Sequence, residues 1–178
     1  VADTLRKNSQ KLIAKLPHNI ETYILTGDHQ KTAQAIAQKL KIKNVIAEVL
    51  PEQKVKEIKK LQKEGKIVAF VGDGLNDAPA LSQADLGIAV GSGTDIALEA
   101  GNIVLTDSNP LKILSALHLS QKTFQTIKEN LFFAFFYNTI AIPLAALGLL
   151  NPMIAALAMS FSSVSVVVNS LKIKNIKL

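Results

Sequence analysis

The sequence contains no cysteine and no tryptophan, and aromatic residues make up only 5% of it. The absence of cysteine excludes a disulfide and a thiolate metal site within this chain. Charge is also missing from one long stretch, because no Asp, Glu, Lys or Arg occurs between Leu131 and Leu171. A membrane-spanning helix needs roughly 20 apolar residues, so this stretch can hold two spans joined by a very short turn.

The 178-residue chain carries a formal net charge of +6. Its lysines are scattered and are not interleaved with aromatic residues, so we expect no nucleic-acid partner. Part of the positive charge flanks the uncharged stretch, at Lys122 and Lys128 before it and at Lys172, Lys174 and Lys177 after it. Basic residues at both ends favour a hairpin in membrane lipid with both of its ends in the cytoplasm.

These features divide the chain into two parts. We expect a cytoplasmic globular domain over residues 1–120, followed over 121–178 by two transmembrane helices and a basic cytoplasmic tail. The helices are predicted over about 123–147 and 152–171. The chain is therefore expected to belong to an integral membrane protein.

The globular part alternates between short apolar runs and amphipathic stretches. Five apolar runs predict strands: "ETYILTGD", "NVIAEVL", "KIVAFVGD", "LGIAV" and "NIVLT". Helical spacing is found in "HQKTAQAIAQKL" and "EQKVKEIKKLQKEG", and shorter helices are expected in "NDAPALSQA" and "TDIALEA". Apolar strands that alternate with helices predict an α/β fold with a parallel sheet covered on both faces.

Two of the predicted strands end in Gly-Asp, at Asp28 and at Asp73, and Asp77 follows shortly after the second. Ligands of parallel α/β sheets bind beyond the carboxyl ends of the strands, where helix N-termini attract anions. Mg²⁺ takes carboxylate and phosphate oxygens together, so these acids predict a magnesium and phosphate site. The alternative is ordinary turn and capping chemistry, since Asp and Gly are common in strand-to-helix loops.

Three segments, "TGDHQKTA", "LPEQK" and "VGDGLNDAPAL", occur in this order. They resemble motifs of the phosphorylation domain of P-type ATPases, and "ADLGIAVGSGTDIALEAGNIVL" resembles the segment that comes after the last motif in that family. The resemblance covers essentially the whole chain. It implies a haloacid-dehalogenase-like (Rossmann-like) fold, with Mg²⁺ and ATP as cofactors.

The first two motifs contain four positions with roles in that family. The resemblance implies that Thr26 binds a phosphoryl oxygen through its hydroxyl and that Gly27 lies in the cofactor site. Asp28 resembles the acid near the hinge and the nucleotide, and Lys54 resembles the lysine that neutralises the phosphoryl group. His29 stands where many members carry Asn, which we interpret as a tolerated loop variation rather than a metal ligand.

The third motif supplies the metal-binding residues. The resemblance implies that Asp73 is a Mg²⁺ ligand and that Asp77 is the second acid organising the same metal site. Asn76 matches a phosphate contact, and Gly72 matches a backbone position in the cofactor site. Charge spread over a transferring phosphoryl group needs fixed positive partners, and the two acids hold the metal that supplies them.

The nucleophile of that family is the Asp of an Asp-Lys-Thr-Gly-Thr motif, which has no match in this sequence. The family's nucleotide-binding domain is also unmatched, while Asp3 resembles the acid of the return hinge, with Thr4 in place of the usual Pro. We therefore expect a C-terminal segment that needs the remainder of the pump to form the phosphoenzyme. Two alternatives stay open: an inactive split or truncated segment that only binds Mg²⁺, phosphate or a partner half, and a membrane-anchored phosphatase with a different nucleophile.

The uncharged stretch contains polar residues at membrane depth, which are candidates for function and also serve helix packing. Tyr137 and Asn138 lie in its first half, and Met159 and Ser163 share a helix face in its second half. A thioether suits Cu(I), although by chemistry alone Met159 is assigned to helix packing.

The Tyr-Asn pair and the following Met-Ser-x-Ser-Ser resemble the last two membrane helices of copper-transporting P-type ATPases. The resemblance implies that Tyr137, Asn138, Met159 and Ser163 occupy copper-site positions. It further implies ATP-driven export of Cu(I) across a bacterial inner membrane. One departure is the turn from Gly148 to Asn151, which is shorter than in most members.

Overall fold

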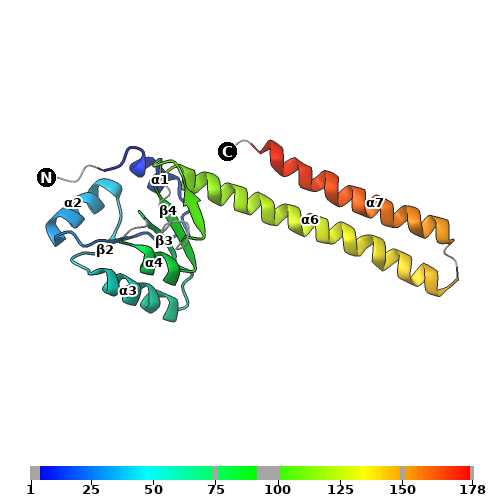
Figure 1. Ribbon diagram of the computed structural model, residues 1–178, viewed down its shortest axis with the longest axis horizontal. Helices are drawn as coiled ribbons and strands as arrows, with labels where there is room; N and C mark the ends of the chain where they lie inside the picture. Colours follow the sequence, from blue (N-terminus) through cyan, green and yellow to red (C-terminus); the bar gives the residue numbers. More distant parts are fainter. Residues whose placement is uncertain (1–4, 74–75, 92–100, 149–150, 177–178) are drawn as a thin grey trace. The chain divides into compact units, whose positions relative to one another are not determined.

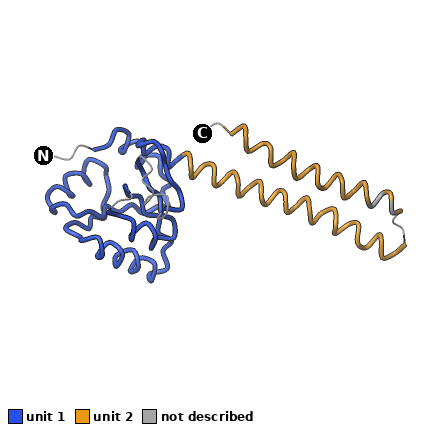
Figure 2. Tube along the Cα trace, in the orientation of Figure 1, with its two compact units in different colours: residues 1–114 blue, residues 115–178 orange. Residues whose placement is uncertain are grey.

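The computed structural model describes residues 5–73, 76–91, 101–148 and 151–176 (Figure 1). The chain forms two compact units, residues 1–114 and residues 115–178 (Figure 2). The elements of the first unit are α1 (Ser9–Lys15), β1 (Tyr23–Leu25), α2 (Gln30–Leu40), β2 (Asn44–Ile46), α3 (Pro51–Lys63), β3 (Ala69–Gly72), α4 (Ala78–Gln83), β4 (Leu86–Val90) and β5 (Ile103–Leu105). These are followed by α6 (Lys112–Ala146), α7 (Pro152–Leu171) and the 3₁₀ helix η1 (Lys172–Asn175).

Each of the five apolar runs contains a strand, and the strands pair in parallel as predicted. Among the described residues the strands form two sheets, one of order β1-β2 and one of order β3-β4-β5. Within the described part of the chain, β1 and β3 therefore share no ladder hydrogen bonds, and the periodicity of the sequence cannot reveal this separation. The predicted short helix "TDIALEA" lies outside the described residues.

The core lies where α3 and α4 pack on β3 and β4. Its buried members are Ile58, Phe70, Ala80, Leu81, Ala84 and Ala89. Leu25 of β1 packs against the same cluster, so the two sheets share one core although they share no ladder. Leu81 is fully buried, and enclosing a leucine side chain contributes about 2 kcal/mol.

The sequence predicts that both faces of the strands are covered, and both faces are buried at β4 but not at β3. Ile88 and Ala89 point to opposite faces of β4, and both are buried. In β3, Phe70 is buried whereas Val71 is 45% exposed, and Ile67 just before the strand is 88% exposed. One apolar face of β3 thus remains open in the described part of the chain.

The second unit contains α7 and most of α6, which run antiparallel side by side (Figure 1). Gly148, just after α6, has a left-handed φ of +70°, a conformation that glycine adopts without strain. Asn151 caps α7, because its side chain accepts a hydrogen bond from the Met153 N–H at 2.9 Å. By length and composition, one stretch of the described residues, Ala156–Asn175, qualifies as a membrane span.

Candidate functional site

The loop after β1 is anchored by backbone hydrogen bonds to β2 and the residues just beyond it. The Thr26 N–H donates to the Ile46 carbonyl at 3.0 Å, and the Thr26 carbonyl accepts from the Val49 N–H at 3.2 Å. The Thr26 hydroxyl donates to Asp28 Oδ2 at 2.9 Å and accepts from the Asp28 N–H at 3.2 Å. The hydroxyl proton therefore points at Asp28, and the hydroxyl would have to rotate away from Asp28 to donate a hydrogen bond to a phosphoryl oxygen.

Glu48 supports this loop, and sequence reasoning missed it. Its backbone has a left-handed φ of +58°, and its N–H donates to the Asp28 carbonyl at 3.0 Å. Its carboxylate contacts His29 Nδ1 at 3.2 Å and accepts from the Gln30 N–H at 3.4 Å. The His29 hydrogen bond, followed by that of Gln30, lowers the pKa of Glu48. The one available signal was an acidic residue within an otherwise largely apolar run.

The loop after β3 is joined to α3 by an ion pair between two predicted site residues. Lys54 Nζ lies 2.6 Å from Asp77 Oδ1, and the two side chains are only 14% and 15% exposed. Lys54 comes from the first turns of α3, and Asp77 immediately precedes α4. The pair fixes a positive charge beside a carboxylate in a largely desolvated position, where its electrostatic effect is strongest.

Gly72 makes the position of Asp77 possible. A Cβ atom at residue 72 would lie 2.6 Å from Asp77 Oδ2 and 2.7 Å from Asp77 Cβ. The end of β3 and the Asp77 side chain therefore approach more closely than any residue with a side chain permits. Gly72 thus makes room for Asp77, and its place in the cofactor site stays a prediction.

Asp73 and Asn76 both have exposed side chains. In the described part of the chain neither forms a side-chain hydrogen bond or ion pair, so the Asp73 carboxylate faces solvent. Carboxylate oxygens of this kind suit Mg²⁺, which keeps several waters and takes one or two carboxylates together with phosphate oxygens. The described residues contain no group of three His, Cys, Asp or Glu that could enclose a metal alone. The donor set therefore fits a magnesium ion that shares its coordination with phosphate and water.

The two loops meet through α3. Val49 donates its N–H to Thr26, and the next residue, Leu50, begins the helix that carries Lys54. The Leu50 N–H donates to Gln53 Oε1 at 2.7 Å, which fixes the first turn. The structure thus joins Thr26 with Asp28, and Lys54 with Asp77, in one unit. Among the described residues it records no hydrogen bond or ion pair between these two pairs.

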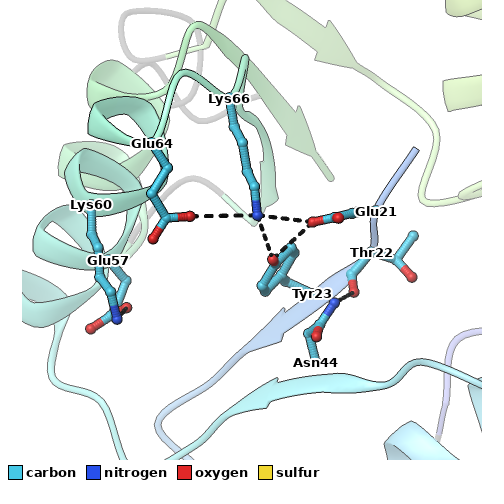
Figure 3. Close-up of polar contacts among 8 residues, drawn as sticks. All are labelled: Glu21, Thr22, Tyr23, Asn44, Glu57, Lys60, Glu64 and Lys66. Carbon is cyan, nitrogen blue, oxygen red and sulfur yellow. Dashed lines mark hydrogen bonds and ion pairs between the residues drawn. The ribbon is translucent and has the colours of Figure 1, made fainter. Parts of the chain in front are cut away.

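A second lysine ties the opposite ends of the strands (Figure 3). Lys66 Nζ lies 3.0 Å from Glu21 Oε2, 3.1 Å from the Tyr23 hydroxyl and 3.5 Å from Glu64 Oε2. Hydrogen bonding to Tyr23, followed by that to Glu21, raises the pKa of Lys66. The hydrogen bond from Lys66, followed by that from Tyr23, lowers the pKa of Glu21. Lys66 thereby links the residues before β3 to the start of β1.

The structure does not bring the four proposed copper-site side chains together by hydrogen bonds in the described part of the hairpin. Asn138 Nδ2 donates to the Ala134 carbonyl at 2.9 Å, and the Ser163 hydroxyl donates to the Met159 carbonyl at 3.2 Å. Both bonds stay within one helix. Met159 is 70% exposed, and Tyr137 makes an edge contact with the ring of Phe136.

A family model described as haloacid dehalogenase-like hydrolase matches residues 1–85. The copper-exporting P-type ATPase of Bacillus subtilis is 52% identical over 99% of this chain. The probable copper-exporting P-type ATPase V of Mycobacterium tuberculosis is 52% identical over 98% of it. The chain belongs to the P-type ATPases. It spans 22% and 23% of the length of these two relatives.

Solved structures agree on the P-type ATPase fold. A zinc-transporting PIB-type ATPase in the E2.Pi state is 37% identical, with a TM-score of 0.89 over 96% of this chain and 28% of that one. The catalytic CPx-ATPase domain CopB-B is 33% identical, with a TM-score of 0.54 over 64% of this chain and 45% of that one. The haloacid-dehalogenase-like fold predicted from the motifs is thereby confirmed.

Proposed function

We propose that this P-type ATPase chain holds Mg²⁺ and the transferring phosphoryl group for a Cu(I)-exporting pump and supplies two of its membrane helices. The observation that carries the proposal is the Lys54–Asp77 pair at 2.6 Å, together with the exposed Asp73, which follows the glycine that lies against Asp77. Phosphoryl transfer requires fixed positive charge and a metal next to the phosphate oxygens, and these residues provide both.

The chain's own residues divide the work at the phosphoryl group. Lys54 keeps its ammonium in place through Asp77 and presents positive charge to the phosphoryl oxygens. Thr26 turns its hydroxyl from Asp28 to donate a hydrogen bond to one of these oxygens. Asp73 and Asp77 would hold Mg²⁺, and the ion would supply positive charge next to the phosphate oxygens. Asn76 and the backbone at Gly27 contact the phosphate or nucleotide.

The phosphorylated aspartate comes from the remainder of the pump. Among the described residues, β1 pairs only with β2 and β3 only with β4, so each keeps one unpaired edge. The exposed Val71 and Ile67 lie on and just before β3. A strand from the remainder of the pump would join these edges, and its carboxyl end would then lie near Thr26 and Asp73.

The transported ion is assigned to Tyr137, Asn138, Met159 and Ser163. We expect a zinc pump to carry a charged residue in these two helices, so the absence of one between Leu131 and Leu171 supports Cu(I) over zinc. A solved relative with a similar fold is a zinc-transporting ATPase. The 52% identity to copper exporters supports the same assignment. We place the pump in the bacterial inner membrane, with the α/β unit and the C-terminus in the cytoplasm.

Asp73→Asn in the complete pump tests the phosphoryl-transfer assignment. Asp73 is exposed and forms no side-chain hydrogen bond or ion pair in the described residues, so we expect the exchange to leave the fold intact while removing an anionic metal ligand. We expect Mg²⁺-dependent phosphorylation from ATP to fall by about 10²–10³-fold, as for other lost electrostatic groups. Glu52→Gln, an exposed exchange in α3, is the control. Normal phosphoenzyme formation in Asp73→Asn would refute the assignment.

A further inference from the structure

Asn169 is the one buried polar residue in the part of the chain that the structure describes, with 5% of it exposed. Its Nδ2 donates to Glu129 Oε2 and to Asn130 Oδ1, both at 3.0 Å, and its Oδ1 accepts from Lys172 Nζ at 3.2 Å. Asn130 Nδ2 donates in turn to the Ser170 hydroxyl at 2.8 Å. We call Glu129, Asn130, Asn169 and Ser170 the polar clamp.

The clamp supplies the hydrogen bonds that join α6 to α7 in the described hairpin. Three other hydroxyls of α7 donate to carbonyls of their own helix: Ser160 to Ala156, Ser163 to Met159, and Ser165 to Phe161. Such bonds place no constraint on the neighbouring helix. Apolar packing between two helices tolerates more than one position of one helix along the other. A buried amide with all its hydrogen bonds made has a defined set of partners, so it is well suited to specify the register of α7 against α6.

The register set by the clamp aligns the proposed copper-site residues. Tyr137 lies as many residues from Asn130 as Ser163 lies from Ser170, a separation of about 10.5 Å along each helix. This separation is one heptad, so Tyr137 lies on nearly the same face of α6 as Asn130, and Ser163 lies on nearly the same face of α7 as Ser170. Since Asn130 is bonded to Ser170, Tyr137 and Ser163 come to the same depth on the same side of the hairpin. Met159 lies one turn farther on that face of α7.

We propose that the polar clamp sets the axial and rotational register of α6 and α7 and thereby positions the four copper-site side chains, with Asn169 as the main positioning residue. This inference rests on the proposed copper function. The clamp acts like the outer shell of a metal site, where losing an orienting partner typically lowers metal affinity about 10- to 100-fold.

The first experiment measures copper activation of the complete pump. In Asn169→Leu and in Glu129→Leu, the Cu(I) concentration for half-maximal phosphorylation from ATP should rise about 10- to 100-fold. Glu129→Gln keeps an oxygen acceptor for Asn169 and should restore nearly normal activation. Ser165→Ala, which removes a hydroxyl bonded within its own helix, is the matched control. Phosphorylation from inorganic phosphate without copper should be unchanged in all four variants.

The second experiment reads the register without copper. Ala134 and Val166 lie on half-buried positions of α6 and α7 and one turn beyond Asn130 and Ser170. In the complete pump with its other cysteines replaced, cysteines at 134 and 166 should be cross-linked by a short bismaleimide more efficiently than cysteines at 134 and 167. Val167 is 58% exposed and serves as the off-interface position. If the clamp sets the register, Asn169→Leu should bring the cross-linking yields of the 134/166 pair and the 134/167 pair close to each other.

The outcomes separate the clamp from the copper assignment. An unchanged cross-linking ratio in Asn169→Leu would overturn the register role. If the cross-linking ratio changes in Asn169→Leu but its copper activation equals that of Ser165→Ala, the positioning role is overturned. The positioning role is also overturned if Asn169→Leu loses phosphorylation from inorganic phosphate in parallel with copper activation. If the unmodified pump shows no copper activation, the proposed ion is wrong, while the cross-linking ratio still decides whether the clamp sets the register.

Discussion

Breaking the Lys54–Asp77 pair should destabilise the α/β unit strongly, because both side chains are about 85% removed from solvent. Lys54→Met would leave the Asp77 carboxylate without its ionic partner in a largely desolvated position. Removing one partner of a buried pair costs about 3–5 kcal/mol, whereas an exposed pair contributes less than about 1 kcal/mol. For a chain of this length, the larger loss lowers the midpoint of thermal unfolding by about 6–20 °C.

Circular dichroism of the chain in detergent micelles would follow this transition, since the chain contains no tryptophan for fluorescence. The double variant Lys54→Met, Asp77→Asn removes both charges and should recover most of the lost stability. A double-mutant cycle with Asp77→Asn then isolates the interaction between the two groups. If Lys54→Met lowers the stability by less than about 1 kcal/mol, the pair behaves as a surface contact and our account of a fixed charge fails.

Gly72→Ala should reduce phosphorylation from ATP, because its Cβ would meet Asp77 Oδ2 at 2.6 Å and push the carboxylate from Lys54; normal activity would show that Asp77 can move freely. Glu21→Gln should lower the midpoint of thermal unfolding at pH 7 but not well below pH 4.5. The pKa of Glu21 is lowered in the fold, so its carboxylate stabilises the fold at pH values above the ordinary glutamate pKa, and this contribution is lost when the group is protonated. An equal effect of the exchange at both pH values would exclude the ionic contribution. Met159→Ala should impair copper-stimulated turnover while phosphorylation from inorganic phosphate survives, and unchanged copper activation would leave Met159 to helix packing.

The motifs select candidate site residues but say nothing of their contacts. Thr26, Lys54 and Asp77 stand in short local segments that sequence reasoning can pick out, and their roles stay predictions. The 2.6 Å approach of Lys54 to Asp77 depends on how α3 lies against β3, which no local pattern determines. Glu48 was missed for the same reason, since its contacts reach a loop that comes much earlier in the chain.

The membrane part shows a different limit of sequence reasoning. Tyr137, Asn138, Met159 and Ser163 were singled out as polar or sulfur-containing residues in an apolar stretch, and the same criterion applies equally to Asn169. Burial and bonding to the neighbouring helix distinguish Asn169 from the rest, and both are tertiary properties. Side-chain type alone therefore does not separate a residue that could bind an ion from one that could orient its neighbours.

The two buried or bridging lysines explain how one helix can set the geometry of the phosphoryl site. Lys54 lies in the first turns of α3 and bonds to Asp77 after β3, while Lys66 lies just beyond α3 and bonds to Glu21 before β1. Because β1 and β3 share no ladder hydrogen bonds in the described residues, side-chain contacts around α3 and the shared core must hold their ends in place. Inserting a strand between them would add backbone hydrogen bonds to an arrangement that these contacts have already prepared.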